Sequence, residues 1–250
     1  MKRTFLLCCL SASLLMACER EEQPAPEEHA ARTVDLRLAF VFTHGTHGYE
    51  LASEYEDAAG HLYKLDRIRF LLSGLHVVDD YNNLLADYPD LRILVDAEAA
   101  SNDFALGTLT ASHAHQIRFH LGLPPGLNHA DPATASAPLD NTAMHWGMAP
   151  DEGYWFLVME GRVDSNGSGS IDEGDAPFSY KCGTDALIRT GWALMHVEIP
   201  DGGTLRIEVP VDVERLMGNV DVTDPATAWG AGALNVQLMD SLSANFHEAH

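Results

Sequence analysis

Histidines are the residues of this chain whose type and spacing first suggest chemistry, and that chemistry is metal binding. Thirteen are present in 250 residues. Neutral imidazole is a common ligand of borderline cations such as copper and zinc. A lone histidine in a strand is more often packed or exposed than metal-bound, so abundance alone permits a transition-metal site without locating it. Three local groups stand out: His44 with His47; His113, His115 and His120; and His129 with His145.

A twelve-residue loop, Asp164 to Asp175, carries the strongest local motif. Oxygen-bearing side chains alternate along it, and Gly169 stands at the sixth position, where calcium loops make a sharp turn. Asp175 replaces the usual glutamate at the twelfth position, which should weaken binding. The flanks read as strands, so the loop is not part of a helix–loop–helix calcium sensor. We expect a structural Ca²⁺ that fixes a long loop, since the sequence offers no disulfide to do so. The alternative is an Asn-Gly hairpin loop without an ion. The expected calcium residues are Asp164, Asn166, Ser168, Ser170, Asp172 and Asp175.

Motifs for other chemistries are absent from the sequence. There is no CxxC or HExxH zinc pattern, nucleophile elbow, phosphate loop or dinucleotide fingerprint. Acidic residues abound, but no pair has a spacing that assigns general acid and base roles. We therefore expect a protein that is not an enzyme.

The N-terminus predicts export and a lipid anchor. Lys2 and Arg3 precede an apolar stretch that ends in Ala17 and Cys18, as in a bacterial lipoprotein signal. The alternative is an ordinary signal peptide with an incidental cysteine. Residues 1–17 are thus the predicted signal peptide, Cys18 the lipidation site, 18–32 a flexible tether and 33–250 the folded domain. Glu19, which stands after Cys18 instead of Asp, favours the outer membrane, with the protein on its periplasmic side.

The charge of the chain limits its possible partners, and its cysteine content limits the disulfide bonds that could stabilise the fold. The chain has 15 Lys and Arg against 37 Asp and Glu, a formal charge of −22. DNA binding depends largely on basic groups that neutralise phosphates, so nucleic acid is excluded as a partner. After signal removal and lipidation only Cys182 remains as a thiol, which leaves no disulfide. It is either buried and inert or a soft metal ligand.

The pattern of elements predicts an all-β fold, an antiparallel β-sandwich with long loops and little helix. Alternating polar and apolar residues indicate strands. A single helical turn is expected at 212–217 and a short C-terminal helix at 234–247. The expected strands cover 34–42, 63–72 and 73–79 (a pair or one bent strand), 115–121, 154–163, 178–182 and 205–213.

Several short blocks resemble the copper-binding MbnP-like family of methanobactin-associated periplasmic proteins. The resemblance covers most of residues 33–247, and its most specific part runs from the Asn-His pair to the Glu-Gly pair. The matching blocks are Asp66 to Ser73, Leu121 to Pro124, Asn128 to Pro132, Ala137 to Leu139, Met144 to Met148, Gly153 to Phe156, Glu160-Gly161 and Val211 to Val213.

This resemblance implies an exported, β-rich copper-binding protein, often paired with a dihaem cytochrome c peroxidase-like partner. In some members that partner oxidises a tryptophan to kynurenine, which joins histidines at copper. Here Phe42 stands where that tryptophan would be, and no Trp-x-His occurs, which speaks against kynurenine chemistry. The expected copper ligands are His44, His129 and His145, with His47 and Cys182 as lesser candidates.

Two functions follow from the sequence. The first is a lipid-anchored protein for copper capture, storage or delivery, acted on by a dihaem partner. The alternative is a calcium-stabilised β-sandwich lipoprotein that binds a surface ligand or protein, with incidental histidines.

Overall fold

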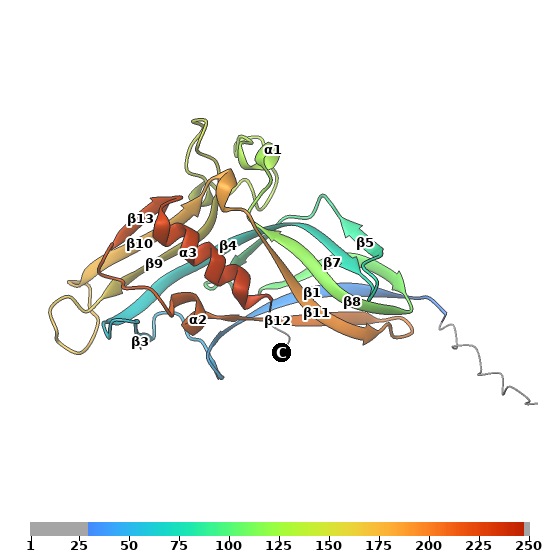
Figure 1. Cartoon of the computed structure of the whole chain (residues 1–250), viewed down its shortest axis with the longest axis horizontal. Coiled ribbons are helices and arrows are strands. Elements are labelled where there is room, and N and C mark those ends of the chain that lie inside the picture. Colours follow the sequence, from blue (N-terminus) through green and yellow to red (C-terminus); the bar gives the residue numbers. More distant parts are fainter. Residues whose placement is uncertain (1–29, 248–250) are drawn as a thin grey trace, which may run out of the picture.

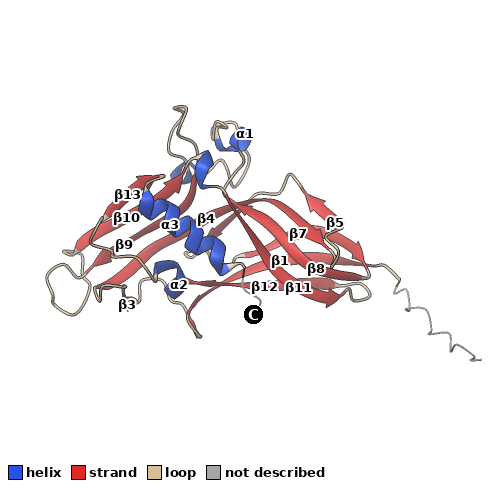
Figure 2. Cartoon of the chain, viewed as in Figure 1, coloured by secondary structure: helices blue, strands red, loops and turns tan. Residues whose placement is uncertain are grey.

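Strands dominate the computed structural model, which describes residues 30–247 (Figures 1 and 2). The predicted signal peptide, Cys18 and most of the predicted tether lie outside the described residues. The strands are β1 (Arg32–His44), β2 (His47–Gly48), β3 (Glu54–Glu56), β4 (Leu62–Val78), β5 (Leu84–Tyr88), β6 (Ile93–Asp96), β7 (Asp103–Ala111), β8 (His113–Leu121), β9 (Trp155–Val163), β10 (Ala176–Gly183), β11 (Arg189–Glu198), β12 (Thr204–Asp212) and β13 (Thr227–Gly230).

Helices are few and short in the described part of the chain. They are α1 (Pro125–Asn128), α2 (Val213–Met217) and α3 (Ala233–Asn245), with single 3-10 turns at Thr142–Met144 and Asp185–Leu187. Asp212 caps α2, because its side chain accepts a hydrogen bond from the Glu214 backbone N–H. No helix among residues 30–247 is long and apolar enough to span a membrane.

The smaller sheet is built around β1. Val34, Leu36 and Leu38 alternate with exposed or half-buried residues along β1 and are buried, as one face of a strand requires. Strand β12 pairs with β1 in parallel, β7 pairs antiparallel at the other edge, and β2 closes a hairpin at the end of β1.

The larger sheet is built around the long strand β4. The first part of β4 pairs with β9 and its last part with β8, so these two strands diverge from each other. The register shifts between Ser73 and His76, where Gly74 takes a left-handed φ of 61°. A bulge of this kind bends a strand. Strand β11 continues the sheet beyond β8, and β10 with β13 continues it beyond β9.

The core lies between the two sheets. Phe40 of β1 makes edge-to-face contacts with Phe70 of β4 (5.9 Å between ring centroids), Phe119 of β8 (6.4 Å) and Phe246 (6.1 Å). Helix α3 contacts β10 and β13 as well as β11 and β12, and Figure 1 shows it lying across the strands. Leu238, a fully buried residue of α3, belongs to the same core.

The predicted all-β sandwich with little helix is confirmed. Every predicted strand overlaps an observed one, the two predicted helices are α2 and α3, and residues 63–79 form one bent strand. Two strand pairs, β1 with β12 and β10 with β13, are parallel instead of antiparallel. Alternation along a single strand reports only its buried face, so it cannot reveal the direction of the neighbouring strand.

Candidate metal centre

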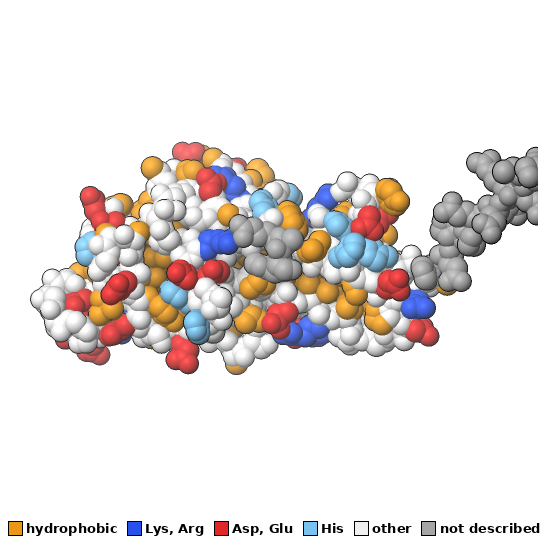
Figure 3. Space-filling model, turned by 60° about the horizontal axis from the view of Figure 1, so that its bottom comes forward, with side chains coloured by type: hydrophobic (Ala, Val, Ile, Leu, Met, Phe, Trp, Pro, Cys, Tyr) orange, Lys and Arg blue, Asp and Glu red, His pale blue; other side chains and the backbone are white. Residues whose placement is uncertain are grey.

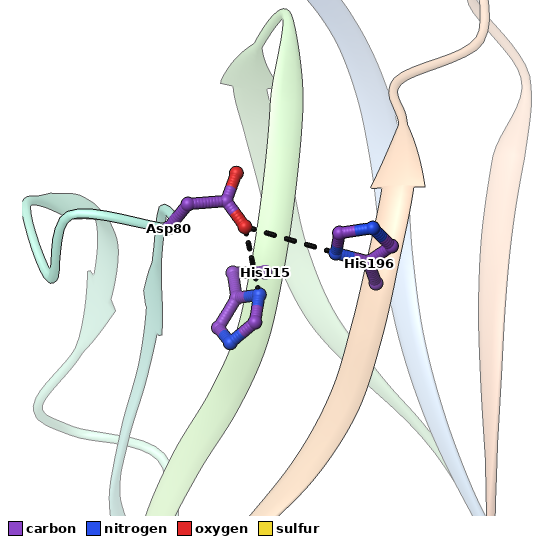
Figure 4. Close-up of side chains that lie close together, drawn as sticks. All are labelled: Asp80, His115 and His196. Atoms are coloured by element: carbon purple, nitrogen blue, oxygen red, sulfur yellow. Dashed lines mark ion pairs between the residues drawn. The ribbon is translucent and has the colours of Figure 1, made fainter. Parts of the chain in front are cut away.

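Three side chains, those of Asp80, His115 and His196, converge at one end of the sheet formed by β4, β8 and β11, and His113 lies beside them against Asp80. His113 and His115 lie two residues apart on β8, so the pleat of the strand puts both on one face. Asp80 comes from the turn between β4 and β5, and His196 from β11. Figure 4 shows the Asp80 carboxylate pointing toward the rings of His115 and His196.

The donor atoms have the spacing of a small metal site. The Asp80 oxygens lie 2.9 Å from His115 Nδ1, 3.0 Å from His113 Nδ1 and 3.7 Å from His196 Nδ1. Four tetrahedral ligands at about 2.0–2.1 Å from one ion stand about 3.3 Å from each other. One donor atom each from Asp80, His115 and His196 lies within 4.8 Å of the other two, so these three are close enough to share an ion.

These nitrogens are buried without hydrogen-bond partners. Nδ1 of His113 and Nδ1 of His115 are inaccessible to solvent and make no hydrogen bond of acceptable geometry. A buried polar atom without a partner is costly, and a metal ion satisfies it. The other side of the cluster is open, because the His196 side chain is 67% exposed. Figure 3 shows histidine side chains gathered beside acidic ones on the molecular surface.

Local backbone geometry sets the orientation of the Asp80 and His196 side chains. Asp79 accepts hydrogen bonds from the backbone N–H groups of Tyr81 and Asn83, which holds the turn that carries Asp80. His196 lies in the register shift of β11 between Leu194 and Val197, with a left-handed φ of 40°. Bulges re-aim side chains next to functional sites, and such strained residues cluster there.

A second cluster consists of Asp57, His61 and Asp221. Its central carboxylate, Asp57, is already occupied by hydrogen bonds that join separate segments of the chain. The buried Asp57 carboxylate accepts hydrogen bonds from the backbone N–H groups of Ala59, His61 and Val222 and from Nδ1 of His61. Burial alone would raise the pKa of Asp57, but the hydrogen bonds from Val222 and His61 outweigh it, so the pKa is lowered.

We expect Asp57→Asn to lower the free energy of unfolding by about 2–4 kcal/mol, because an amide cannot accept all four hydrogen bonds. The folded-state pKa of Asp57 lies below its unfolded value. Its contribution is therefore present above the unfolded pKa and is lost as pH falls through the folded pKa. Urea unfolding at neutral and acidic pH measures both effects.

Asp87→Asn is the matched control, since Asp87 is exposed on β5. It should change stability by less than about 0.5 kcal/mol. Equal unfolding curves for the two variants would contradict the role given to Asp57.

The five copper ligands predicted from sequence do not meet in a three-residue cluster within residues 30–247. His44 stacks on Tyr55, with 4.2 Å between ring centroids, and its Nδ1 lies 3.8 Å from a Glu214 oxygen. His47, across the hairpin from His44, is exposed. His129 Nε2 lies 3.2 Å from an oxygen of Asp185.

The other two predicted ligands are more buried. His145 packs against Tyr154, and its Nε2 is buried without a partner. Burial lowers the pKa of His145, which keeps its ring neutral at pH 7. Cys182 is fully buried, and burial raises the pKa of its thiol to about 12, so it stays protonated. The roles of these five residues in copper binding stay a prediction.

The predicted calcium loop is folded around its first and last carboxylates. Asp164 accepts from the backbone N–H of Gly167 and Ser168 through Oδ1 and of Gly169 through Oδ2. Asp175 accepts from the Ser165 and Asp172 backbone N–H groups. Asp164, Asp172 and Asp175 do not form a converging cluster like that of Asp80. Calcium binding stays a prediction.

Sequence reasoning noted His113 and His115 as a group but missed Asp80 and His196 as their neighbours. The usable signal was the His-x-His spacing in an alternating strand, which places both rings on one face. Asp80 and His196 carry no local signal, since only the pairing of β8 with β4 and β11 brings them near.

Comparison with known proteins gives two matches. The family model MbnP matches residues 33–233, well over half of the chain. Among solved structures, MbnP from Methylosinus trichosporium is similar, with a TM-score of 0.52 and 15% sequence identity, over 81% of this chain and 82% of that one. At this identity the similarity shows a shared fold. No curated protein matches the chain.

Proposed function

The chain belongs to the MbnP family, and on that premise we propose that it is an exported copper-binding protein whose metal centre is Asp80, His113, His115 and His196. The observation that carries the proposal is the pair of buried, unpartnered Nδ1 atoms facing one carboxylate. Copper is the metal linked to the family, and imidazole is a ligand that suits it.

The donor set favours one oxidation state. Three imidazoles and a carboxylate offer nitrogen and oxygen and no sulfur, a combination that suits Cu(II) better than Cu(I). Among divalent first-row ions, Cu(II) also binds a given site most tightly. We propose that the role of the cluster is to hold the ion for capture, storage or delivery.

The setting of the protein forms part of the proposal. The basic start, apolar stretch and Ala17-Cys18 pair support export and a lipid anchor on the periplasmic side of a membrane, the outer one being favoured by Glu19. Family membership supports a periplasmic protein. A dihaem cytochrome c peroxidase-like protein is the proposed partner.

Titration of the purified mature protein with Cu(II), in competition with a chelator, tests the copper proposal. We expect one equivalent to bind tightly and to give an electron paramagnetic resonance spectrum with nitrogen hyperfine structure. The control is the same protein with alanine at all three histidines and asparagine at Asp80. Equal copper affinity in the two proteins would overturn the assignment.

We also propose that the Asp164–Asp175 loop binds Ca²⁺ as a structural staple. The supporting observation is the 2.8 Å hydrogen bond from Gly169 N–H to Asp164 Oδ2, which joins the first and sixth positions. Calcium at about a hundredfold excess over its dissociation constant would add about 2.7 kcal/mol. This stabilisation would also serve the alternative function, a calcium-stabilised binding lipoprotein with incidental histidines.

We expect calcium to raise the melting temperature by roughly 5–10 °C relative to EDTA, as that free energy implies for a chain of this size. Differential scanning calorimetry measures the shift. Asp164→Asn should abolish it, whereas His115→Ala should retain it. The same melting temperature in calcium and in EDTA would refute the calcium site.

A further inference from the structure

Strand β8 carries a second set of polar side chains, further along the strand than the metal cluster. Gln116, Arg118 and His120 alternate with Ile117 and Phe119, which are buried in the core. They therefore point to the other side of the sheet. Ala114, which stands between His113 and His115, is also buried in the core, so the alternation of buried residues shifts by one position between His115 and Gln116.

Strand register aligns this set with residues of both neighbouring strands. Arg118 pairs with His76 on β4 and with Trp192 on β11. One step along, His120 pairs with Ser73 and with Thr190. Directly opposed residues on adjacent strands lie close enough for their side chains to contact. The three strands thus present two cross-strand rows, one centred on Arg118 and one on His120.

These rows line a hollow of about 560 Å³, among whose walls are His76, Gln116, Arg118, His120, Thr190 and Trp192. Its size lies within the range of small-molecule sites. Trp192 forms an aromatic wall and stacks on His247, with 6.0 Å between ring centroids. The hollow therefore combines a flat apolar surface with groups that donate hydrogen bonds.

Arg118 brings a positive charge that no carboxylate neutralises. Its Nε donates to Gln116 Oε1 and its Nη2 donates to Asn82 Oδ1, both of which are neutral acceptors. Within residues 30–247, no carboxylate oxygen lies within ion-pair distance of Arg118, although acids outnumber bases more than twofold in the chain. A guanidinium group in such a place favours an oxyanion, which it binds through paired N–H groups.

We propose that this hollow binds a small organic oxyanion, a carboxylate or phosphate group carried on a flat apolar body. Arg118 holds the charged end, His76 and His120 supply further hydrogen bonds, and the apolar body lies against Trp192. Burial and the nearby His76 lower the pKa of His120, so its ring is neutral at pH 7 and Arg118 carries the charge. None of the residues that would hold the anion belongs to the metal cluster, although Asn82, which accepts a hydrogen bond from Arg118, lies in the same turn as Asp80.

Isothermal titration calorimetry with benzoate, a flat carboxylate, tests the proposal, and Trp192 gives a fluorescence readout. We expect saturable binding of benzoate in the millimolar range or tighter and none of uncharged benzyl alcohol. Inorganic phosphate, which lacks the apolar body, should bind more weakly. Equal binding of benzoate and benzyl alcohol would overturn the anion site, and phosphate binding as tightly as benzoate would overturn the role of Trp192.

Arg118→Gln should weaken benzoate binding at least about tenfold, since it removes a charge-assisted pair. Arg206→Gln is the matched control, because Arg206 is paired with Asp103 and Glu208 elsewhere on the surface. It should leave the affinity unchanged. Trp192→Leu is a second variant that keeps the arginine and should weaken benzoate more than phosphate. Unchanged benzoate affinity in folded Arg118→Gln would contradict the proposal.

Discussion

His115→Ala is expected to weaken Cu(II) binding by about a hundredfold or more. Altering a group that merely orients a metal ligand typically costs 10–100-fold in affinity, and removing a ligand should cost at least as much. His115 Nδ1 is the closest of the three ring nitrogens to the Asp80 carboxylate, at 2.9 Å, and it is buried and makes no hydrogen bond. Chelator-competition titration measures the change, and loss of nitrogen hyperfine structure in the spectrum would identify the missing ligand.

The companion variants His113→Ala, His196→Ala and Asp80→Asn should act in the same direction. Among them His196→Ala should have the smallest effect, because its Nδ1 lies 3.7 Å from the carboxylate and its ring is the most exposed. His47→Ala is the control, since His47 is exposed on the short strand β2. Thermal melting of each apo variant, unchanged from that of the parent protein, would show that the fold is intact.

The same titration decides between the two ligand sets. If the Asp80 cluster holds copper, His44→Ala, His129→Ala and His145→Ala should each bind copper as the parent protein does. Loss of affinity in these variants, with His115→Ala unaffected, would return the site to the residues predicted from sequence. If the Asp80 cluster holds copper, Cys182→Ser should also bind copper as the parent protein does.

The blocks that carry the family resemblance hold a loop together, which gives them a structural role besides the copper role predicted for His129 and His145. Asn128 Oδ1 accepts a hydrogen bond from the Tyr154 backbone N–H at 2.8 Å, and the Tyr154 hydroxyl donates to the Leu139 carbonyl at 2.7 Å. A Cβ atom on Gly153 would stand 2.5 Å from the Asn128 carbonyl oxygen. Three matching blocks therefore meet in one packing unit, and His129 and His145 lie within it.

The fold was more predictable than the site because the two depend on different kinds of information. A strand such as β8 is visible from its own alternation, and its His-x-His pair follows from the pleat. The position of Asp80 depends on the turn after β4, and that of His196 on a bulge in β11. Neither the register between distant strands nor a local backbone irregularity can be recognised from the spacing of residues in the sequence. Asp80 and His196 therefore could not be predicted as neighbours of His113 and His115.

Among glycine-to-alanine substitutions in this chain, Gly161→Ala should be the most destabilising. We expect it to lower the free energy of unfolding by about 3–5 kcal/mol or to prevent folding. A Cβ atom at this position would stand 2.1 Å from the Lys64 carbonyl oxygen and 2.7 Å from the Phe178 ring. Gly161 pairs with Leu65 of β4 and with Phe178 of β10, so it lies inside the sheet. Overpacking a core costs about 1–3 kcal/mol, and here backbone must move as well.

Backbone displacement makes this glycine different from those that only need a left-handed conformation. Moving the Lys64 backbone would break hydrogen bonds between β4 and β9. It would also disturb Glu160, which precedes Gly161 and forms a 2.9 Å ion pair with Lys181. Gly126→Ala is the matched control, because a Cβ there meets nothing within 4 Å and alanine favours the short helix α1. Urea unfolding should therefore separate the two variants by several kcal/mol, and equal midpoints would mean that β4 and β9 can part without cost.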